Sequence, residues 1–355
     1  MVLHSRLRPL PHRRSHSLTS QFHPPSLSSA EYSAAARPEF GSDDQLSDSD
    51  SDAEPEDLFA SFLQIPHLFP DDVPPFHGDP GQYLLYSSPR YGELQIMVPS
   101  YPSQGADSSK KKTGSGSLDD ETNEVDEGRK LCAHFLWSAG MVVAEGIEHA
   151  DTDSCEGDSE MWKVKGEKVL ELGAGAALPS LTAALASASS VTITDHPSSP
   201  ALLPHGSISF NTTHNLRSNL PCPITIHPHE WGTLSTDPWA LSTKGTYTRI
   251  IAADCYWLRG EHENLARTMK WFLAPEGKVW VVAGFHTGRE VVRGFFETVT
   301  KVGLVVERIW ERDLNTSLGV DEVRRDWVEV REGEGVENRR RWCVVAVLGH
   351  AGSSS

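Results

Sequence analysis

The sequence feature that most constrains the fold is a short apolar run that ends in an acid and then turns on two glycines, at residues 168–181. It reads Lys-Val-Leu-Glu-Leu-Gly-Ala-Gly-Ala-Ala-Leu-Pro-Ser-Leu, which predicts a strand, a tight turn and a helix. Glycine allows the backbone to turn sharply and lets a ligand approach without meeting a Cβ atom. The amide groups at the start of the helix present a partial positive charge to that ligand. Gly173 and Gly175 are therefore predicted to form one wall of a binding pocket.

A second segment, Val-Thr-Ile-Thr-Asp at residues 191–195, follows about twenty residues after the turn and ends in Asp195. We expect it to form a second strand. A carboxylate in this position accepts hydrogen bonds from both ribose hydroxyls of a nucleoside. The strand, the glycine turn, the helix and the second strand therefore predict a nucleoside pocket, and they leave open which nucleoside it holds.

Strands and helices alternate along this part of the chain, which predicts a parallel sheet with right-handed crossovers. The last two strands have no helix of useful length between them, and a short link permits only antiparallel pairing. We therefore predict an α/β fold, a doubly wound, seven-stranded, mostly parallel sheet with an antiparallel C-terminal strand. The expected helices are 131–147, 179–187, part of 198–217, 261–273 and 289–302, and the expected strands are 168–172, 191–195, 224–227, 247–253, 278–283, 304–309 and 342–348.

The chain is expected to divide into four segments. Residues 1–57 are rich in Ser and Pro and then acidic, so they bury too little apolar surface to fold and are expected to form a disordered tail. Residues 58–100 are expected to hold a docking segment and a β-hairpin, residues 101–128 a low-complexity linker, and residues 129–355 the α/β domain. Arginines without acids near the N-terminus also suit a mitochondrial presequence, but prolines interrupt any long amphipathic helix there.

Charge and composition exclude several classes of protein. The net charge is -17, and residues 1–128 hold 21 acids against 9 Lys and Arg, so no basic surface for nucleic acid is evident. No apolar run approaches the ~20 residues that a membrane helix needs. The five cysteines lack CxxC spacing and the histidines lack metal-ligand spacing, so we expect no metal site. Such cysteine usage indicates a reducing compartment, and we expect the cytoplasm, with the nucleus as a second location.

Three further motifs give the sequence a family resemblance. They are Leu-Trp-Ser-Ala-Gly at 136–140, Trp-Gly at 231–232 and Ala-Asp-Cys-Tyr-Trp at 253–257, with residues 261–267 and 282–289 in support. Together with the glycine turn, Asp195 and the reversed last strand, they resemble the Rossmann-like class I S-adenosylmethionine-dependent methyltransferases. Within that class they resemble the lysine-methyltransferase-like branch called family 16, including its fungal nicotinamide N-methyltransferase-like members. The resemblance covers roughly residues 129–349, so residues 129–355 are expected to be a methyltransferase domain.

The resemblance implies S-adenosylmethionine as the cofactor and assigns residues to it. Asp195 would hold the ribose hydroxyls, and Trp231 would lie against the adenine. Glu171 would orient the glycine loop or meet the amine of the cofactor. The alternatives are ordinary structural roles: a helix N-cap for Asp195, and core packing for the two tryptophans of the set. The implied cofactor-binding residues are Trp137, Glu171, Gly173, Ala174, Gly175, Asp195, Trp231 and Ala253.

Asp254 and Trp257 are the implied substrate-side catalytic residues, because they follow the fourth strand at the edge where parallel sheets bind ligands. Aromatic faces can desolvate an amine and attract its cationic product. The other interpretation of Asp254 is a structural acid that caps the next loop. The chain departs from the family pattern at Ala177, where a third glycine is frequent, and at Trp257, where Tyr or Phe is usual.

The leading hypothesis is an S-adenosylmethionine-dependent N-methyltransferase of a protein amine. A yeast relative of the resembling branch modifies the N-terminus and a nearby lysine of translation elongation factor 1-alpha, so this factor is the expected partner of a monomeric enzyme. An acidic tail would steer a basic partner. The alternatives are methylation of a small amine such as nicotinamide, a non-catalytic interaction protein with the same fold, and a nicotinamide-dinucleotide oxidoreductase.

Overall fold

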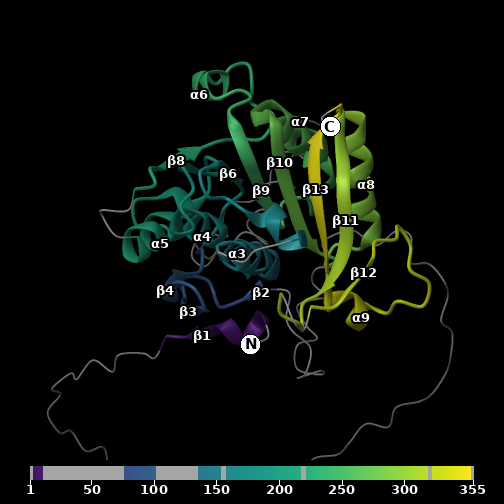
Figure 1. The fold of residues 1–355 in the computed structure, drawn as a ribbon, viewed down its shortest axis with the longest axis horizontal. Helices are drawn as coiled ribbons and strands as arrows, with labels where there is room; N and C mark the ends of the chain where they lie inside the picture. Colours follow the sequence, from purple (N-terminus) through teal and green to yellow (C-terminus); the bar gives the residue numbers. More distant parts are fainter. Residues whose placement is uncertain are drawn as a thin grey trace, which may run out of the picture. The chain divides into compact units, whose positions relative to one another are not determined.

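The computed structural model describes residues 3–10, 76–100, 135–152, 157–216, 221–318 and 322–352. All of these residues belong to one compact unit of the chain (Figure 1). The expected docking segment and the expected linker at 101–128 lie outside the described residues, so they stay predictions. None of the helices in the described ranges combines the length and the apolar character that crossing a membrane would require.

The main sheet has eight strands in the order β12-β11-β13-β10-β9-β6-β7-β8. The strands from β10 to β8 pair in parallel, whereas β13 is antiparallel to both of its neighbours, β10 and β11. The bounds are β6 Lys168–Leu172, β7 Ser190–Asp195, β8 Ile224–Pro228, β9 Tyr247–Ala253, β10 Leu273–Gly284, β11 Leu304–Asp313, β12 Arg324–Asp326 and β13 Trp342–His350. The doubly wound architecture with a reversed last strand is confirmed. The predicted number of seven strands is one too few, because the three-residue β12 is too short to show a periodic pattern.

Helices cover both faces of this sheet and enclose two apolar cores. One core lies under α3 Ser138–Ala150, α4 Leu178–Leu185 and α5 Ser207–Asn215. The other lies under α6 Pro238–Ser242, α7 His262–Phe272 and α8 Arg289–Lys301. The remaining helical turns are η2 Gly157–Trp162, η3 Pro200–Leu202, η4 Arg259–Glu261 and α9 Val336–Arg340.

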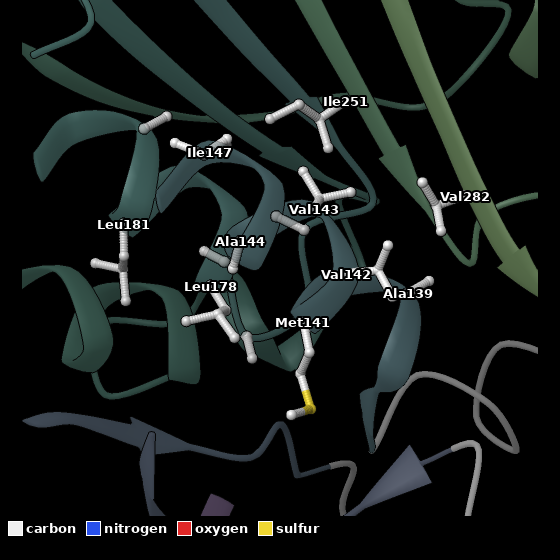
Figure 2. Close-up of a cluster of buried hydrophobic side chains, with 14 of the residues drawn as sticks. Ala139, Met141, Val142, Val143, Ala144, Ile147, Leu178, Leu181, Ile251 and Val282 are labelled. Carbon is white, nitrogen blue, oxygen red and sulfur yellow. The ribbon is translucent and has the colours of Figure 1, made fainter. Parts of the chain in front are cut away.

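The central strands supply both cores because successive side chains of a strand point to opposite faces. Ile250 packs in the core under α7, and its neighbour Ile251 packs in the core under α3. Figure 2 shows the second arrangement, with apolar side chains of α3 grouped near Leu181 of α4 and near Ile251 and Val282 of the sheet. A parallel sheet covered on both faces favours strands with consecutive apolar residues, and the central strands β9 and β10 carry such runs.

The N-terminal residues correct one prediction. Residues 3–10 are not part of a disordered tail, because Leu3–Arg6 form the turn η1 and Leu7–Pro9 form the strand β1. This strand pairs antiparallel with β3 Tyr83–Ser88, which also pairs with β4 Gly92–Met97. The predicted hairpin is therefore confirmed and gains a third strand from the start of the chain. Residues 11–57 lie outside the described residues.

A second correction concerns the helix predicted at 131–147. The helix α3 begins at Ser138, because the two preceding residues form the strand β5 Leu136–Trp137, which pairs with β2 Phe76–His77. The apolar residues of β5 belong to this pairing and not to a helical face. The helix also continues to Ala150, three residues beyond its predicted end at 147.

Candidate functional site

A cleft opens at the carboxyl ends of β6, β7 and β9, beside the start of α3. The strand β7 lies on one side of β6, and β9 lies on its other side, so the strand order reverses at β6. Ligands bind at such a reversal in open α/β sheets, and the cleft lies there. Its empty volume, counted to its open mouth, is about 1010 Å³. All ten residues that the sequence singled out line it: Trp137, Glu171, Gly173, Ala174, Gly175, Asp195, Trp231, Ala253, Asp254 and Trp257.

The glycine turn needs its glycines for different reasons. Gly173 has a φ of 62°, and a Cβ there would lie 3.0 Å from the Cys255 Sγ and 3.2 Å from the Trp231 Cζ2. Gly175 also has a positive φ, 52°, but a Cβ would meet nothing closer than the Pro99 Cγ at 3.7 Å. At Gly173 both the backbone conformation and the packing of Cys255 and Trp231 therefore favour glycine, whereas at Gly175 only the conformation does.

Ala177 takes the left-handed conformation that a third glycine would adopt more easily, with a φ of 55°. It is the N-cap residue of α4 and is completely buried. Because this position is completely buried, only a small side chain such as that of alanine fits between the turn and the helix. At this departure from the family pattern, alanine thus holds a left-handed conformation that glycine would adopt at lower cost.

Glu171 joins the first strand to the first turn of α4. Its Oε2 atom accepts a hydrogen bond from the Ser180 amide at 3.0 Å and another from the Ser180 hydroxyl. Burial raises the pKa of this carboxyl to about 8. Of the two roles expected for Glu171, this geometry supports orientation of the glycine loop, since the bonds to Ser180 fix the helix that follows the loop.

Asp195 faces the glycine turn across the cleft. Its Oδ2 atom accepts a hydrogen bond from the Gly175 amide at 2.8 Å, and its Oδ1 atom accepts one from the His196 amide at 2.7 Å. Burial raises the pKa of this carboxyl above its ordinary value, against the effect of these two bonds. The Ser199 side chain also donates a hydrogen bond to this carboxylate, so at least one of its roughly four acceptor sites remains for a ribose hydroxyl.

Two tryptophan side chains, Trp137 and Trp231, line the cleft. Trp231 is half-buried, and the following Gly232 has a φ of 85° with no room for a Cβ, which would lie 2.6 Å from the Asn264 Oδ1. Trp137 lies in β5, not in a helix as predicted, and its ring stacks on the ring of His286 at 4.4 Å between centroids. Both tryptophans thus have fixed orientations at the cleft wall.

Asp254 is buried and holds a strained backbone position, with a φ of 53°. Its Oδ1 atom accepts a hydrogen bond from the Gly284 amide at 3.1 Å, and the Ala139 amide also donates to its carboxyl group. Burial raises its pKa to about 7. Asp254 therefore connects the end of β9, the end of β10 and the start of α3, while Trp257 lies half-buried at the same end of the cleft.

Two residues near the cleft were missed by the sequence analysis. His286 is fully buried, and its Nδ1 atom lies 3.7 Å from the Asp254 Oδ1. It belongs to the supporting motif at 282–289, but its residue type gave no reason to select it. Asn211 reaches the glycine turn from α5, and no sequence signal identified it. Within the described ranges, no group of His, Cys, Asp and Glu side chains could hold a metal ion.

Comparison with known proteins decides the family. Residues 119–302, more than half of the chain, match the lysine methyltransferase family. The chain belongs to this family. The protein N-terminal and lysine N-methyltransferase EFM7 of Candida glabrata is 31% identical over 183 residues, which are 50% of this chain and 66% of that protein. The Candida albicans protein of the same name is 30% identical over 229 residues, which are 62% of this chain and 83% of that protein.

Among solved structures, the TehB-like SAM-dependent methyltransferase from Corynebacterium glutamicum has a TM-score of 0.39 and 18% identity, over 66% of this chain and 99% of that chain. Family membership makes this protein an S-adenosylmethionine-dependent methyltransferase. The oxidoreductase alternative is thereby excluded.

The residues of the cleft fit this methyl donor, which carries two positive charges and two ribose hydroxyls. Glu171, Asp195, Asp254 and Glu261 line the cleft, and no lysine or arginine is among its described lining residues. The remaining acceptor capacity of Asp195 suits a ribose hydroxyl, and the indole face of Trp231 suits the adenine. When bound, S-adenosylmethionine supplies a methyl group already activated by its positively charged sulfur. The chain supplies orientation, counter-charges and exclusion of water.

Proposed function

We propose that this methyltransferase acts on an amine of a protein, a lysine side chain or an N-terminal amine, and that translation elongation factor 1-alpha is its substrate. The observation that carries the proposal is the composition of the cleft after β9, where Asp254, Trp257 and Glu261 line it. Two acids and an indole face attract a cationic amine. The curated relatives, whose names state N-terminal and lysine methylation, support the same acceptor class.

The side chains at this end of the cleft can prepare the amine for transfer. The carboxylate form of Asp254 accepts a hydrogen bond from an ammonium group, whose charge in turn favours that form near the pKa of about 7. Trp257 excludes water from the amine, and desolvation favours the neutral amine, which alone has a free lone pair for the methyl group. The chain thus needs to align the acceptor and help to remove one proton, and no covalent intermediate on the protein is required.

The decisive experiment sorts a transferred label between proteins and small molecules. The purified full chain is incubated with methyl-tritiated S-adenosylmethionine and an extract of Candida albicans cells that lack the EFM7 relative, with nicotinamide added to a parallel sample. We expect label in protein, and specifically in elongation factor 1-alpha after immunoprecipitation. Peptide mapping of the purified factor by mass spectrometry then places the methyl groups on its N-terminus or on a lysine.

Asp195→Ala is the control for this experiment. It removes the carboxylate expected to hold the ribose hydroxyls of the donor, and it leaves intact the end of the cleft where the amine would bind. Label that appears only in nicotinamide or another small amine would replace the proposal with the small-molecule alternative. Label in proteins other than the elongation factor would keep the acceptor class and refute the named substrate. No label in any fraction, with the donor bound, would favour a non-catalytic interaction protein.

A further inference from the structure

The outer edge of the β3–β4 hairpin is closed by two asparagines of α5 in place of a further strand. The Met97 amide donates to the Asn211 Oδ1 at 2.7 Å, and the Asn211 Nδ2 donates to the Met97 carbonyl at 3.1 Å. Asn215 makes the same pair of bonds with the amide and carbonyl of Gln95, both at 2.8 Å. Residues four apart on a helix and two apart on a strand have similar spacings, about 6 to 7 Å, so the two amides match the strand edge.

The two asparagines differ in the group that accepts the second hydrogen bond from their side-chain Nδ2 atom. The Asn211 Nδ2 donates to the Ala176 carbonyl at 2.8 Å, and Ala176 belongs to the glycine turn that lines the cleft. The Asn215 Nδ2 donates instead to the Asn211 carbonyl of its own helix. Asn211 is completely buried, whereas the bonds of Asn215 lie in a partly buried region. Only Asn211 of this pair connects the hairpin to the glycine turn.

A second bond from α5 supports the same turn. The Ser207 hydroxyl donates to the Gly175 carbonyl at 2.7 Å, so two successive carbonyl groups of the turn are held from the side of α5. The chain after the hairpin also lies against the turn, since a Cβ on Gly175 would have the Pro99 Cγ as its nearest neighbour. Because each carbonyl shares a rigid peptide plane with the next amide, these bonds also set the directions of the Ala176 and Ala177 amides.

We propose that Asn211 is a positioning residue for the methyl-donor pocket, through which the hairpin sets the conformation of the glycine turn. The hairpin, residues 83–97, precedes the 119–302 segment that matches the family, so part of the support for the donor site comes from outside the matched segment. The proposal concerns the donor alone and does not depend on which amine is methylated. Loss of the Asn211 amide leaves the buried Ala176 carbonyl without this donor and releases the turn.

The test compares Asn211→Ala with Asn215→Ala in the full chain, because both substitutions remove the same pair of bonds to the hairpin edge. Donor affinity is measured by isothermal titration with S-adenosylmethionine, stability by urea unfolding, and turnover at saturating donor. For Asn211→Ala we expect donor affinity to fall about tenfold, the equivalent of one buried hydrogen bond, with turnover at saturating donor within about twofold of wild type. For Asn215→Ala we expect donor affinity within about twofold of wild type, because the glycine turn keeps its bond.

Ser207→Ala keeps the proposal testable if Asn211→Ala does not fold. This substitution removes only the bond to the Gly175 carbonyl, at the first position of α5, and we expect it to weaken donor binding about threefold with little loss of stability. Equal donor affinities for the Asn211 and Asn215 variants would overturn the proposal, and so would an Asn211 variant that is less stable but binds the donor as wild type does. If the chosen acceptor assay fails while these affinities differ as expected, the proposed function is at fault and the positioning role stands.

Discussion

Arg6 and Glu145, 139 positions apart in the chain, form a buried ion pair with an N–O distance of 2.8 Å. Arg6 also contacts Glu148 at 2.6 Å, and Glu145 is shared with Arg312 of β11. Both glutamates lie on α3, whose first residues reach the cleft. These ion pairs thus hold together the N-terminal residues, the helix α3 beside the cleft and the strand β11.

The first prediction concerns this ion pair. Arg6→Ala is expected to lower the free energy of unfolding by about 3 kcal/mol, because it removes the paired arginine from the buried carboxylate of Glu148 and one of two from Glu145. The value is at the lower end for such pairs because Arg312 continues to compensate Glu145. Arg8→Ala is the matched control, since the Arg8–Glu93 pair is more than half exposed on both sides, 56% and 53%, and its loss should cost about 0.5 kcal/mol. Urea unfolding of both variants is the measurement, and equal losses would contradict the role given to Arg6.

The second prediction concerns donor binding by Asp195. Asp195→Ala is expected to lower the affinity for S-adenosylmethionine about 100-fold, because hydrogen bonds to a charged acceptor contribute about 1.5–3 kcal/mol each. Asp195→Asn keeps an acceptor for the Gly175 amide and should lose less. Isothermal titration measures both affinities. An alanine variant that binds the donor as tightly as wild type would show that the ribose is held elsewhere.

The third prediction separates backbone strain from packing at Gly173. Gly173→Ala and Gly245→Ala place a side chain at nearly the same φ, 62° and 63°. A Cβ on Gly245 would have no neighbour closer than 3.9 Å, whereas a Cβ on Gly173 would press on Cys255 and Trp231. Both variants should lose about 1 kcal/mol of stability from the left-handed conformation. Only Gly173→Ala should lose a further ~1–3 kcal/mol from overpacking and bind the donor more weakly, as urea unfolding and titration calorimetry can show.

The fourth prediction is a pH dependence that arises from Glu171. Burial raises the pKa of this carboxyl from 4.5 to about 8, so the folded state binds the proton more tightly than the unfolded state does. Its contribution to stability is therefore fully present below pH 4.5 and is lost as the pH rises through about 8. Glu171→Gln does not titrate and keeps an oxygen for Ser180. Without donor, the stability of wild type relative to this variant should fall across that range in urea unfolding, and a constant difference would refute the raised pKa.

The sequence predicted the central sheet well because each strand carries its own signal. Most side chains of the strands β6, β7 and β9 are buried, and each strand carries enough Val, Ile, Leu or Ala to be recognised. The strand β12 has three residues at the sheet edge and carries no such signal. Leu136 and Trp137 were assigned to a helix because a two-residue strand depends on a partner, Phe76–His77, that lies about 60 positions earlier.

The candidate site was predicted for a different reason. Residues at the carboxyl ends of neighbouring parallel strands meet at one sheet edge, so the turn after β6, Asp195 and Asp254 had to lie together once the fold was correct. His286 and Asn211 could not be found in this way. Their importance depends on contacts with Trp137 and Ala176, and neither contact leaves a periodic pattern in the chain.

The amino-acid sequence alone determined the strands, the glycine turn and the acids at the strand ends, and therefore the residues that line the candidate cleft. Only the tertiary structure decided that residues 3–10 belong to the folded unit and that the hairpin supports the glycine turn. The physical reason is that both depend on contacts between residues far apart in the sequence: the pairing of β1 with β3 and the ion pairs of Arg6 in the first case, and the bonds of Asn211 in the second. Burial makes those partnerships strong, and burial is a property of the folded chain.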